Sequence, residues 1–378
     1  MELTISKKDL LRSLARTHGV ADRKSSMPIL SNVLIRASSD RRVRFAATDL
    51  YLGVVATAEC EVKKEGSLAV SARTLFDIAK NLPDSSVRFS VDEGQSLEIR
   101  CGRVRYRVPA MPGDDFPPLP NPGEASFSSL DANLLGELIT LTQYSMSSDD
   151  TRPHLAGALF EGEGALVRMV TTDGHRLSKA ERSLSEEGSS LGFSMLVPHK
   201  GIGELRRVIE DARSEHGKKA GVTTIEVATD GGSAFFRRHN VLLSIKLASD
   251  QFPPYSKVIP QQQVRQVGIP RSSFVEALKR ISLVANEKSG GIRLRIEDGK
   301  LHITSENPEV GEGAEELDVD YAGESLEIGF NARYLMDVIG ALAEEEVLLE
   351  LSGELDPGVV RPVQSEGDFV GVIMPMRI

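Results

Sequence analysis

The sequence predicts an α+β protein of three repeated domains, each with two helices packed on antiparallel sheets. Its 378 residues are enough for two or three domains, each with a hydrophobic core of its own. The same order of elements, namely helix, strands, helix and strands, recurs three times along the chain. The segments 70–77, 197–204 and 330–337 align without a gap, with an apolar residue first, a basic residue fourth and an acidic residue eighth. We therefore expect domains at 1–125, 126–262 and 263–378.

The composition, 40% hydrophobic and 26% charged, is that of a soluble globular protein. Cys60 and Cys101 are too few and too far apart for a disulfide framework or a metal site, so we expect free thiols and no metal or cofactor. The sequence contains no apolar run of the length of a signal peptide or a membrane span, which predicts a cytoplasmic protein that binds no membrane. The formal net charge of -10 argues against a nucleic-acid partner unless positive charge gathers on particular faces.

The first copy of the repeat begins with a helix at 6–17, for which Ser6 is a suitable N-cap and the leucines form one apolar face. A second helix is expected at 72–82, where Pro83 ends it. Four prolines within 114–123 break all regular structure and mark the end of the domain. Alternating or β-branched runs predict the strands of this copy at 30–38, 42–50, 52–62, 86–91 and 97–108.

The second and third copies follow the same order. In the second, helices are expected at 129–143 and 198–210. In the third, a helix starts near Pro270, whose ring suits a helix N-terminus, and another covers 331–342. The strands of these two copies are expected at 155–161, 165–172, 224–228, 233–246, 292–296 and 300–305.

Side chains with reactive or charged groups are most concentrated in the stretch 170–177. There His175 and Arg176 follow a predicted strand that ends in Thr172 and Asp173. A base and a cation at a strand exit are typical of an active site. However, similar residues return at 47–50 and at 304–307, so the stretch reads as one copy of a repeat. A hydrolase would also need a nucleophile and an orienting acid, and the sequence contains no Gly-rich phosphate loop, nucleophile elbow or metal-ligand cluster.

Basic residues recur on the second helices. Arg73 with Lys80, and Lys200 with Arg207, lie seven residues apart and so on one helix face. A single such face is usually a solvated surface with intrahelical ion pairs. Because a basic position returns in all three copies, we favour a function in binding a polyanion. Dispersed cations attract duplex DNA without reading its sequence.

Several motifs together resemble one family. They are Pro-Ile-Leu at 28–30, Thr-Asp-Gly-His-Arg-Leu at 172–177, Asn-Glu-Lys at 286–288, Gly-Phe-Asn at 329–331 and Val-Ile-Met-Pro-Met-Arg at 372–377. The chain resembles, over essentially its whole length, the beta subunits of bacterial DNA polymerase III, which are sliding clamps. The resemblance implies the DNA clamp fold: a head-to-tail homodimer forms a closed ring with helices facing a central hole. It also implies a non-catalytic processivity factor for DNA replication, placed around duplex DNA by an ATP-driven clamp loader complex.

The resemblance further implies a hydrophobic pocket for short linear motifs of the DNA polymerase III alpha subunit, the clamp loader, other polymerases and repair proteins. Unbranched, polarizable methionines at the chain terminus suit a pocket that serves many peptides. On the residues alone, ordinary strand packing is the favoured role for them, and only the resemblance reverses that order. The pocket positions are Leu155, Thr172, Gly174, His175, Arg176, Leu177, Pro253, Val258, Leu355, Val372, Met374 and Met376.

The dimer contacts and the DNA contacts are implied in the same way. A strand through 103–108 alternates arginines with apolar residues and would meet the third domain of the second subunit. The dimer-interface positions are Arg103, Arg105, Tyr106, Val108, Leu283, Val284, Glu309, Glu312 and Glu315. The DNA-facing positions are Lys24, Arg73, Lys80, Arg152, His154, Lys200, Arg207 and Arg333.

Two departures from the family's pattern bear on these positions. The helix at 129–143 has no Lys or Arg, and Asp149 stands where relatives often carry an uncharged residue that contacts DNA. The main alternative function is a repeat-built scaffold that binds peptides and has no role on DNA.

Overall fold

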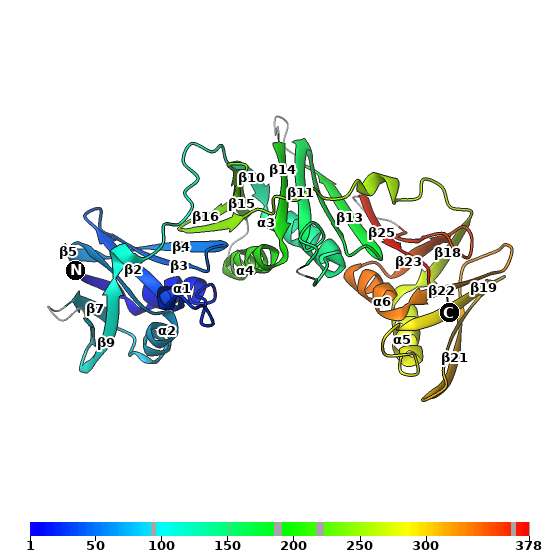
Figure 1. Ribbon diagram of the computed structural model, residues 1–378, viewed down its shortest axis with the longest axis horizontal. Helices are drawn as coiled ribbons and strands as arrows, with labels where there is room; N and C mark the ends of the chain where they lie inside the picture. Colours follow the sequence, from blue (N-terminus) through cyan, green and yellow to red (C-terminus); the bar gives the residue numbers. More distant parts are fainter. Residues whose placement is uncertain (92–95, 150, 185–190, 217–222, 364–367, 378) are drawn as a thin grey trace. The chain divides into compact units, whose positions relative to one another are not determined.

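The computed structural model describes the chain except for residues 92–95, 150, 185–190, 217–222, 364–367 and 378 (Figure 1). Its contacts divide the chain into two compact units. Unit one comprises Met1–Ala132 and Arg207–Leu247, and unit two comprises Asn133–Arg206 and Ala248–Ile378. Each unit therefore crosses one of the expected domain boundaries. Those boundaries, at 125 and 262, stay a prediction.

Unit one contains a sheet of thirteen described strands in the order β10-β15-β16-β17-β4-β3-β2-β6-β9-β8-β7-β1-β5. Helices α1 (Lys7–Thr17) and α2 (Ala72–Asn81) pack against each other. The strands from the first third of the chain are β1 (Glu2–Ser6), β2 (Asn32–Ser38), β3 (Arg42–Thr48), β4 (Leu52–Glu59), β5 (Glu61–Lys64), β6 (Gly66–Ser71), β7 (Ser86–Val91), β8 (Ser96–Cys101) and β9 (Val104–Pro112). The remaining strands are β10 (Ser128–Asp131), β15 (Thr224–Thr229), β16 (Ser233–Arg238) and β17 (Val241–Lys246).

Unit two contains an eight-stranded sheet in the order β14-β11-β12-β13-β25-β24-β23-β18 and a four-stranded sheet in the order β21-β20-β19-β22, counted over the described residues. The first consists of β11 (Gly157–Gly164), β12 (Leu166–Thr172), β13 (Arg176–Ser183), β14 (Leu191–Pro198), β18 (Arg265–Pro270), β23 (Glu346–Leu351), β24 (Gly358–Pro362) and β25 (Asp368–Ile373). The second consists of β19 (Gly291–Glu297), β20 (Lys300–Asn307), β21 (Gly311–Asp318) and β22 (Leu326–Asn331).

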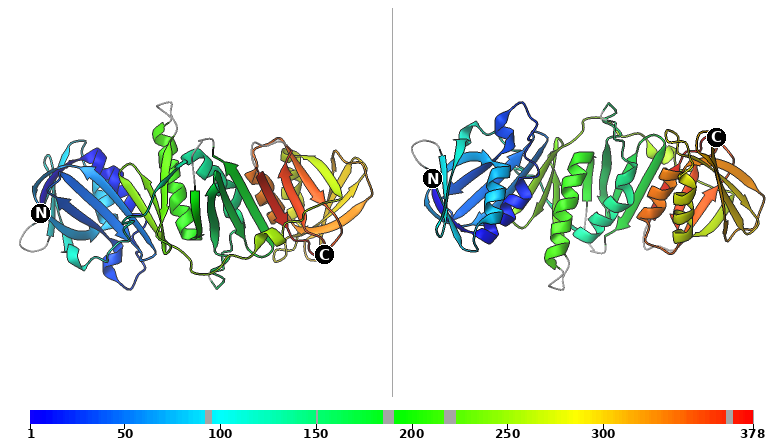
Figure 2. Two further views of the ribbon diagram at one scale, coloured as in Figure 1. Left: turned by 90° about the horizontal axis from the view of Figure 1, so that it is seen from above. Right: turned by 90° about the horizontal axis from the view of Figure 1, so that it is seen from below.

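The other helices are α3 (Ala132–Thr142), α4 (His199–His216), α5 (Arg271–Ser282) and α6 (Ala332–Ala341), with 3-10 turns η1 (Pro28–Ser31), η2 (Gly113–Asp115), η3 (Gln143–Ser145) and η4 (Tyr255–Lys257). Helices α5 and α6 lie side by side on one face of the unit-two strands (Figure 2). Of the described helices, none combines the length and apolar character of a membrane span.

The two large sheets repeat the same strand order. In unit one the run is β2-β3-β4-β17-β16-β15, and in unit two it is β11-β12-β13-β25-β24-β23. In each run a strand of one repeat pairs antiparallel with a strand of the next, as Ala56 does with Val241 and Leu177 with Val372. This order confirms the α+β class and the repeated architecture. Because backbone hydrogen bonds join neighbouring repeats into one sheet, the compact units straddle the repeats.

The predicted helices agree closely with the structure, and local capping explains why. Ser6 caps α1 as expected, since its Oγ accepts a hydrogen bond of 3.0 Å from the Asp9 N–H. Asn331 caps α6 by accepting from the Arg333 N–H at 2.9 Å. The helix expected at 198–210 is longer and ends at His216, and that expected at 129–143 starts after the short strand β10.

Two predicted strands were wrong because each is a hairpin, and a third, 52–62, was wrong because it divides into β4 and β5 at Cys60. The run 97–108 divides into β8 and β9 at Gly102, whose positive φ of 56° allows the tight turn. Arg103 therefore lies in a turn and not on a strand face. The run 233–246 divides into β16 and β17 at His239 and Asn240. Alternating apolar residues mark both arms of a hairpin, and without an Asn-Gly type signal the turn went unrecognised.

Candidate functional site

The stretch that looked catalytic forms a tight turn between β12 and β13. The Thr172 Oγ1 donates to the Arg176 carbonyl at 2.6 Å and accepts from the Gly174 N–H at 3.1 Å. The Asp173 Oδ1 accepts from the N–H groups of His175 and Arg176 at 2.9 and 3.0 Å. Gly174 adopts a positive φ of 92°, which a side chain would disfavour. One oxygen of the carboxylate thus holds the backbone, while the other accepts from the Arg176 guanidinium at 3.0 Å. His175 is an exposed residue of the turn.

The same turn occurs at two other places. The Thr48 Oγ1 donates to Leu52 at 2.6 Å, and the Asp49 Oδ1 accepts from the Tyr51 N–H at 2.9 Å. The Thr229 Oγ1 donates to the Ser233 carbonyl at 2.9 Å, while Asp230 accepts from two following N–H groups. The expected copy at 304–307 was wrong, because these residues continue β20. A Thr-Asp pair closes this turn, and 304–307 contains no such pair.

Arg176 is almost buried and joins three segments of unit two. Its guanidinium pairs with Asp173 at 3.0 Å and with Asp337 on α6 at 2.5 Å. It also donates to the Tyr144 carbonyl at 2.5 Å and lies 4.4 Å from the ring centroid of Tyr334. Burial raises the pKa of the Tyr144 hydroxyl above its ordinary value. Arg176 is therefore a brace between segments that lie far apart in the sequence.

The C-terminal strand β25 lies directly beside this turn. The Met374 N–H donates to the His175 carbonyl at 2.9 Å, continuing the pairing of Leu177 with Val372. Leu177 and Val372 are buried in a hydrophobic cluster with Val170, Val359 and Val370. The sheet thus brings residues that are almost 200 positions apart to one place, and the exposed Met374 follows directly after it.

The connecting segment after Leu247 packs on the same cluster. Phe252, Tyr255 and Ile259 contact it as partly buried side chains. The Tyr255 hydroxyl donates to Glu161 at 3.1 Å and accepts from Arg168 at 3.3 Å. These contacts hold η4 and the exposed Val258 beside β13 and β25. None of these three side chains was among the predicted pocket residues, although Phe and Tyr next to a Pro-Pro pair indicate a linker that packs.

The predicted pocket residues all belong to unit two, and their exposure divides them into three groups. Three apolar side chains are exposed: Val258 at 43%, Leu355 at 62% and Met374 at 38%. Leu355 precedes β24, whose Gly358 pairs with Ile373, so its loop lies at the end of the sheet where Met374 emerges. The buried members are Leu155, Thr172, Leu177 and Val372, the partly buried members are Arg176, Pro253 and Met376, and the exposed turn residues are Gly174 and His175.

The predicted DNA-facing residues are mostly exposed. In unit one, Lys24, Arg73, Lys80 and Arg207 are exposed, and in unit two Lys200 and Arg333 are exposed. Arg73 lies 3.7 Å from Asp77, and Arg333 lies 4.0 Å from Asp337, each within one helix turn.

Arg152 and His154 are only partly exposed. The Arg152 guanidinium pairs with Asp149 at 3.0 Å and donates to the Asp173 carbonyl at 3.2 Å. Hydrogen bonds from Thr151, together with Arg152, hold the pKa of Asp149 below its ordinary value. Arg152 therefore supports the turn at 172–176 and has less charge available for DNA than the helix residues have.

Two of the strand edges that are open in the described structure carry predicted dimer-interface residues. Residues 104–109 of β9 pair with β8 on one side, while β6 pairs only with the last three residues of β9. β21 pairs only with β20 and ends its sheet. Unpaired edges of this kind recruit further strands. Exposed apolar side chains accompany both edges, namely Tyr106 on β9 and Leu283 and Val310 near β21.

Two charges of the predicted interface already have partners within the chain. Arg105 pairs with Glu98, and Glu315 pairs with Arg280 at 2.5 Å. Hydrogen bonds from Arg100 and then Arg105 hold the pKa of Glu98 below its ordinary value. The hydrogen bond from Arg280 likewise holds the pKa of Glu315 below its ordinary value. Glu309 and Glu312 are exposed, Val284 is partly exposed and Val108 is buried.

Comparison with known proteins covers the whole chain. The family profile of the DNA polymerase III beta subunit, N-terminal domain, matches residues 1–120. Those of its central domain and C-terminal domain match 129–253 and 256–377. The beta sliding clamps of Caulobacter vibrioides and Pseudomonas putida are 34% and 36% identical, each over 100% of both chains. The crystal structure of the DNA polymerase III subunit beta from Pseudomonas aeruginosa matches with a TM-score of 0.93 at 33% identity, over 100% of both chains.

The three family profiles occur in the order in which the sequence repeats, and the full-length structural match covers all the sheets described above. The resemblance seen in the motifs is thereby confirmed, and the chemistry of the turn at 172–176 agrees with it, since its polar groups hold backbone and not substrate. The chain belongs to the family of bacterial DNA polymerase III beta subunits, the non-catalytic sliding clamps of DNA replication, and has their DNA clamp fold.

Proposed function

We propose that two copies of this chain close head to tail into a ring around duplex DNA. The observation that supports this arrangement is the pair of open strand edges, one in each unit, with Tyr106 beside the first and Leu283 beside the second. Leu283 is 78% exposed, and an apolar side chain so exposed next to an unpaired edge is typical of an interaction surface. In the ring, β9 of one copy would extend the sheet of β21 in the other.

The helix cations supply the DNA contact in this proposal. Arg73 and Arg333 occupy equivalent positions on α2 and α6, and their side chains are 69% and 81% exposed. Their ion pairs with Asp77 and Asp337 are long and solvated, so phosphate can displace them at little cost. Contacts of this kind attract DNA without sequence preference and weaken as salt rises, which suits a protein that slides.

The apolar surface formed by Val258, Leu355 and Met374 is the proposed pocket for short linear motifs. Its buried floor is the cluster around Leu177 and Val372, and its rim is the polar turn at His175. We propose that the DNA polymerase III alpha subunit, the clamp loader complex, other polymerases and repair proteins dock there. Because the DNA lies in the bacterial cytoplasm, we expect the protein to act in that compartment.

Retention on circular DNA tests the ring. The protein is loaded onto a nicked circular plasmid with a compatible clamp loader and ATP, and the circle is then cut once with a restriction enzyme. Cutting changes the topology of the DNA and leaves its charge unchanged, so a ring should slide off the ends. Protein that stays bound after linearisation would contradict encirclement. Protein that is never retained, with a loader shown to work on a known clamp, would favour the peptide-binding scaffold.

A charge-reversed variant tests the lining within the same assay. Arg73→Glu with Arg333→Glu should lower the salt concentration at which the clamp is lost from the circle, because four positive charges become four negative ones in the dimer. The matched control is Lys63→Glu with Arg295→Glu, which changes the same charge at exposed strand positions. Equal salt sensitivity of the two variants would refute a DNA-facing role for the helices.

A further inference from the structure

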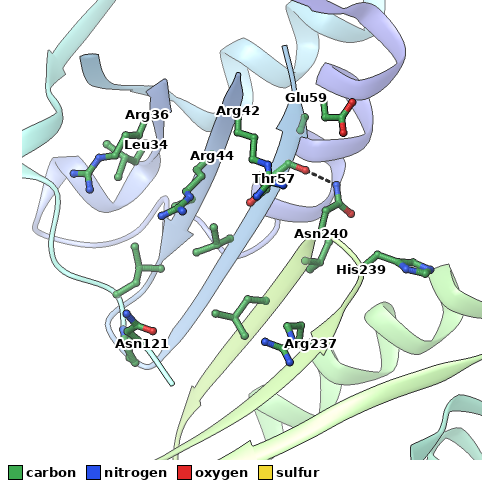
Figure 3. A pocket seen from close by; sticks show the side chains of 17 residues that line it. Leu34, Arg36, Arg42, Arg44, Thr57, Glu59, Asn121, Arg237, His239 and Asn240 are labelled. Carbon is green, nitrogen blue, oxygen red and sulfur yellow. Dashed lines mark hydrogen bonds between the residues drawn. The ribbon is translucent and has the colours of Figure 1, made fainter. Parts of the chain in front are cut away.

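A groove lies on the sheet of unit one, and none of its lining residues is among the predicted pocket, DNA-facing or dimer-interface residues. It has a volume of about 720 Å³, within the usual range of ligand pockets. Strands β2, β3, β4 and β17 form its floor, and the segment 119–121 crosses beside it. Figure 3 shows the side chains of Arg36, Arg42, Arg44 and Arg237 around this groove.

The arginines of β2 and β3 are placed against electrostatic preference. Arg36 and Arg44 are direct cross-strand partners, and like charges in that position repel each other. Among the described residues, no carboxylate forms an ion pair with Arg36, Arg42 or Arg44, and all three are exposed. The nearby acids are Glu59, which faces Arg42 across β4, and the exposed Asp40.

The other residues that line the groove add little negative charge. Arg237 is held by Glu226 at 2.7 Å, and Asn240 at the hairpin tip bonds through its backbone carbonyl to the Thr57 N–H at 2.8 Å. His239, beside it, has a positive φ of 48°, a conformation that non-glycine residues rarely adopt outside functional or tightly held turns. In a chain of net charge -10, Arg36, Arg42 and Arg44 together form a local anion-attracting surface.

The floor between the arginines is aliphatic. Leu34 and Ala46 are buried in a cluster against which Val55 and Leu119 pack. Leu119 reaches the sheet because Gly53 leaves space for it: a Cβ at Gly53 would lie 2.8 Å from the Leu119 Cδ2. The groove thus offers cations at its sides and apolar surface at its base.

The repeated strand order shows which surface of unit two corresponds to this groove. It lies on β3, β4 and β17, which correspond in the repeat to β12, β13 and β25. The connecting segment at 119–121 likewise corresponds to the one at 252–259, which packs on β13 and β25. The same architecture therefore presents two comparable surfaces, one apolar and one rich in arginine.

We propose that the groove of unit one binds an acidic segment of a partner protein, in which carboxylates meet Arg36, Arg42 and Arg44 and an apolar side chain meets Leu34 and Leu119. A peptide is favoured over single-stranded nucleic acid by the lining. Proteins that bind single-stranded nucleic acid typically stack its bases on aromatic side chains, and the seventeen described lining residues include no Phe, Tyr or Trp. Guanidinium groups bind carboxylates through paired hydrogen bonds, and the aliphatic base accepts leucine or valine.

The test uses the full-length protein and a fluorescein-labelled hexapeptide of alternating aspartate and leucine, with fluorescence anisotropy as the readout. Wild type should bind this peptide. The affinity of the Arg36→Gln, Arg44→Gln variant should be lower by about tenfold or more. The matched control, Lys63→Gln with Lys64→Gln, removes the same charge from exposed positions on β5 and should bind like wild type. Failure of wild type to bind, or equal losses in the two variants, would overturn the proposal.

Three further binding experiments distinguish an acidic peptide in this groove from other ligands and from binding at the unit-two pocket. The same peptide with asparagine in place of aspartate should not bind; if it binds equally well, carboxylate recognition is wrong. A Met374→Ala, Met376→Ala variant should retain the acidic peptide; if binding is lost, the peptide occupies the unit-two pocket. A labelled twelve-nucleotide oligothymidine that competes for the groove and is lost with the same arginines would make nucleic acid the occupant and refute a peptide.

We expect the arginine variants to fold, so that misfolding does not explain a loss of peptide binding. Because Arg36 and Arg44 repel each other, the Arg36→Glu variant would place opposite charges across the two strands. Its thermal midpoint should equal or exceed that of wild type while its affinity for the acidic peptide falls. A lower midpoint would show that Arg36 serves the fold, which would overturn its assignment to ligand binding.

Discussion

Replacing Arg176 with alanine tests whether this side chain braces unit two. The side chain is 10% exposed, while the paired carboxylates of Asp173 and Asp337 are 14% and 30% exposed. Removing one partner of a buried ion pair costs about 3–5 kcal/mol, and the partial exposure of Asp337 moves the expectation to the lower end. Loss of the ring contact with Tyr334 adds up to about 1 kcal/mol. We expect the free energy of unfolding to fall by about 3 kcal/mol.

Differential scanning calorimetry measures this effect as a shift of the unfolding transition. For a body of this size each kcal/mol lowers the midpoint by about 2–4 °C, so a fall of roughly 6–12 °C is expected. Arg333→Ala is the matched control, because Arg333 approaches the same carboxylate at 4.0 Å but is 81% exposed. It should cost less than about 0.5 kcal/mol.

A double-mutant cycle with Asp337→Asn isolates the pair itself. Arg176 and Asp337 should be coupled by more than about 1 kcal/mol, whereas Arg333 and Asp337 should be coupled by less than about 0.5 kcal/mol. If Arg176→Ala proves no more destabilising than Arg333→Ala, the reasoning from burial and geometry is refuted.

Three other predictions concern the pocket, the dimer and a thiol. Met374→Ala with Met376→Ala should weaken a polymerase-derived peptide about tenfold in isothermal titration and leave the dimer intact by sedimentation; undiminished binding would contradict the pocket. Leu283→Asp should shift sedimentation toward monomer, whereas Val264→Asp, which is equally exposed at 79%, should not; a dimer that survives both changes would refute the proposed interface. Burial, aided by Asp40, raises the pKa of the Cys60 thiol to about 11, above the unfolded value of about 8.5. The unfolded chain therefore loses its proton first, so the free energy of unfolding should fall as pH rises from about 8.5 to 11; urea unfolding of Cys60→Ser should lack this component, and an identical pH dependence would disprove it.

The helices and their caps could be predicted because their signals are local. Ser6 and Asn331 lie next to the N–H groups that they satisfy, and apolar residues three and four apart define the buried face within a few turns. The threefold order of elements is likewise readable from residue types alone. The hairpins at Gly102 and at His239 were missed, since alternation continues through both arms and only the turn distinguishes them from one strand.

The sequence by itself determined the repeat, the helices with their exposed cations and the motifs that identify the family. The tertiary structure decided which strands pair across repeats, that Asp173 holds a turn, and that Arg176 reaches Asp337. It also decided that Arg36 and Arg44 face each other above an aliphatic floor. The physical reason is that strand pairing and burial join residues far apart along the chain. The backbone hydrogen bonds that do so are nearly independent of residue type, since every residue can accept and every residue except proline can donate. Such contacts leave no local pattern, so only the folded chain reveals which charges are paired and which are left for a ligand.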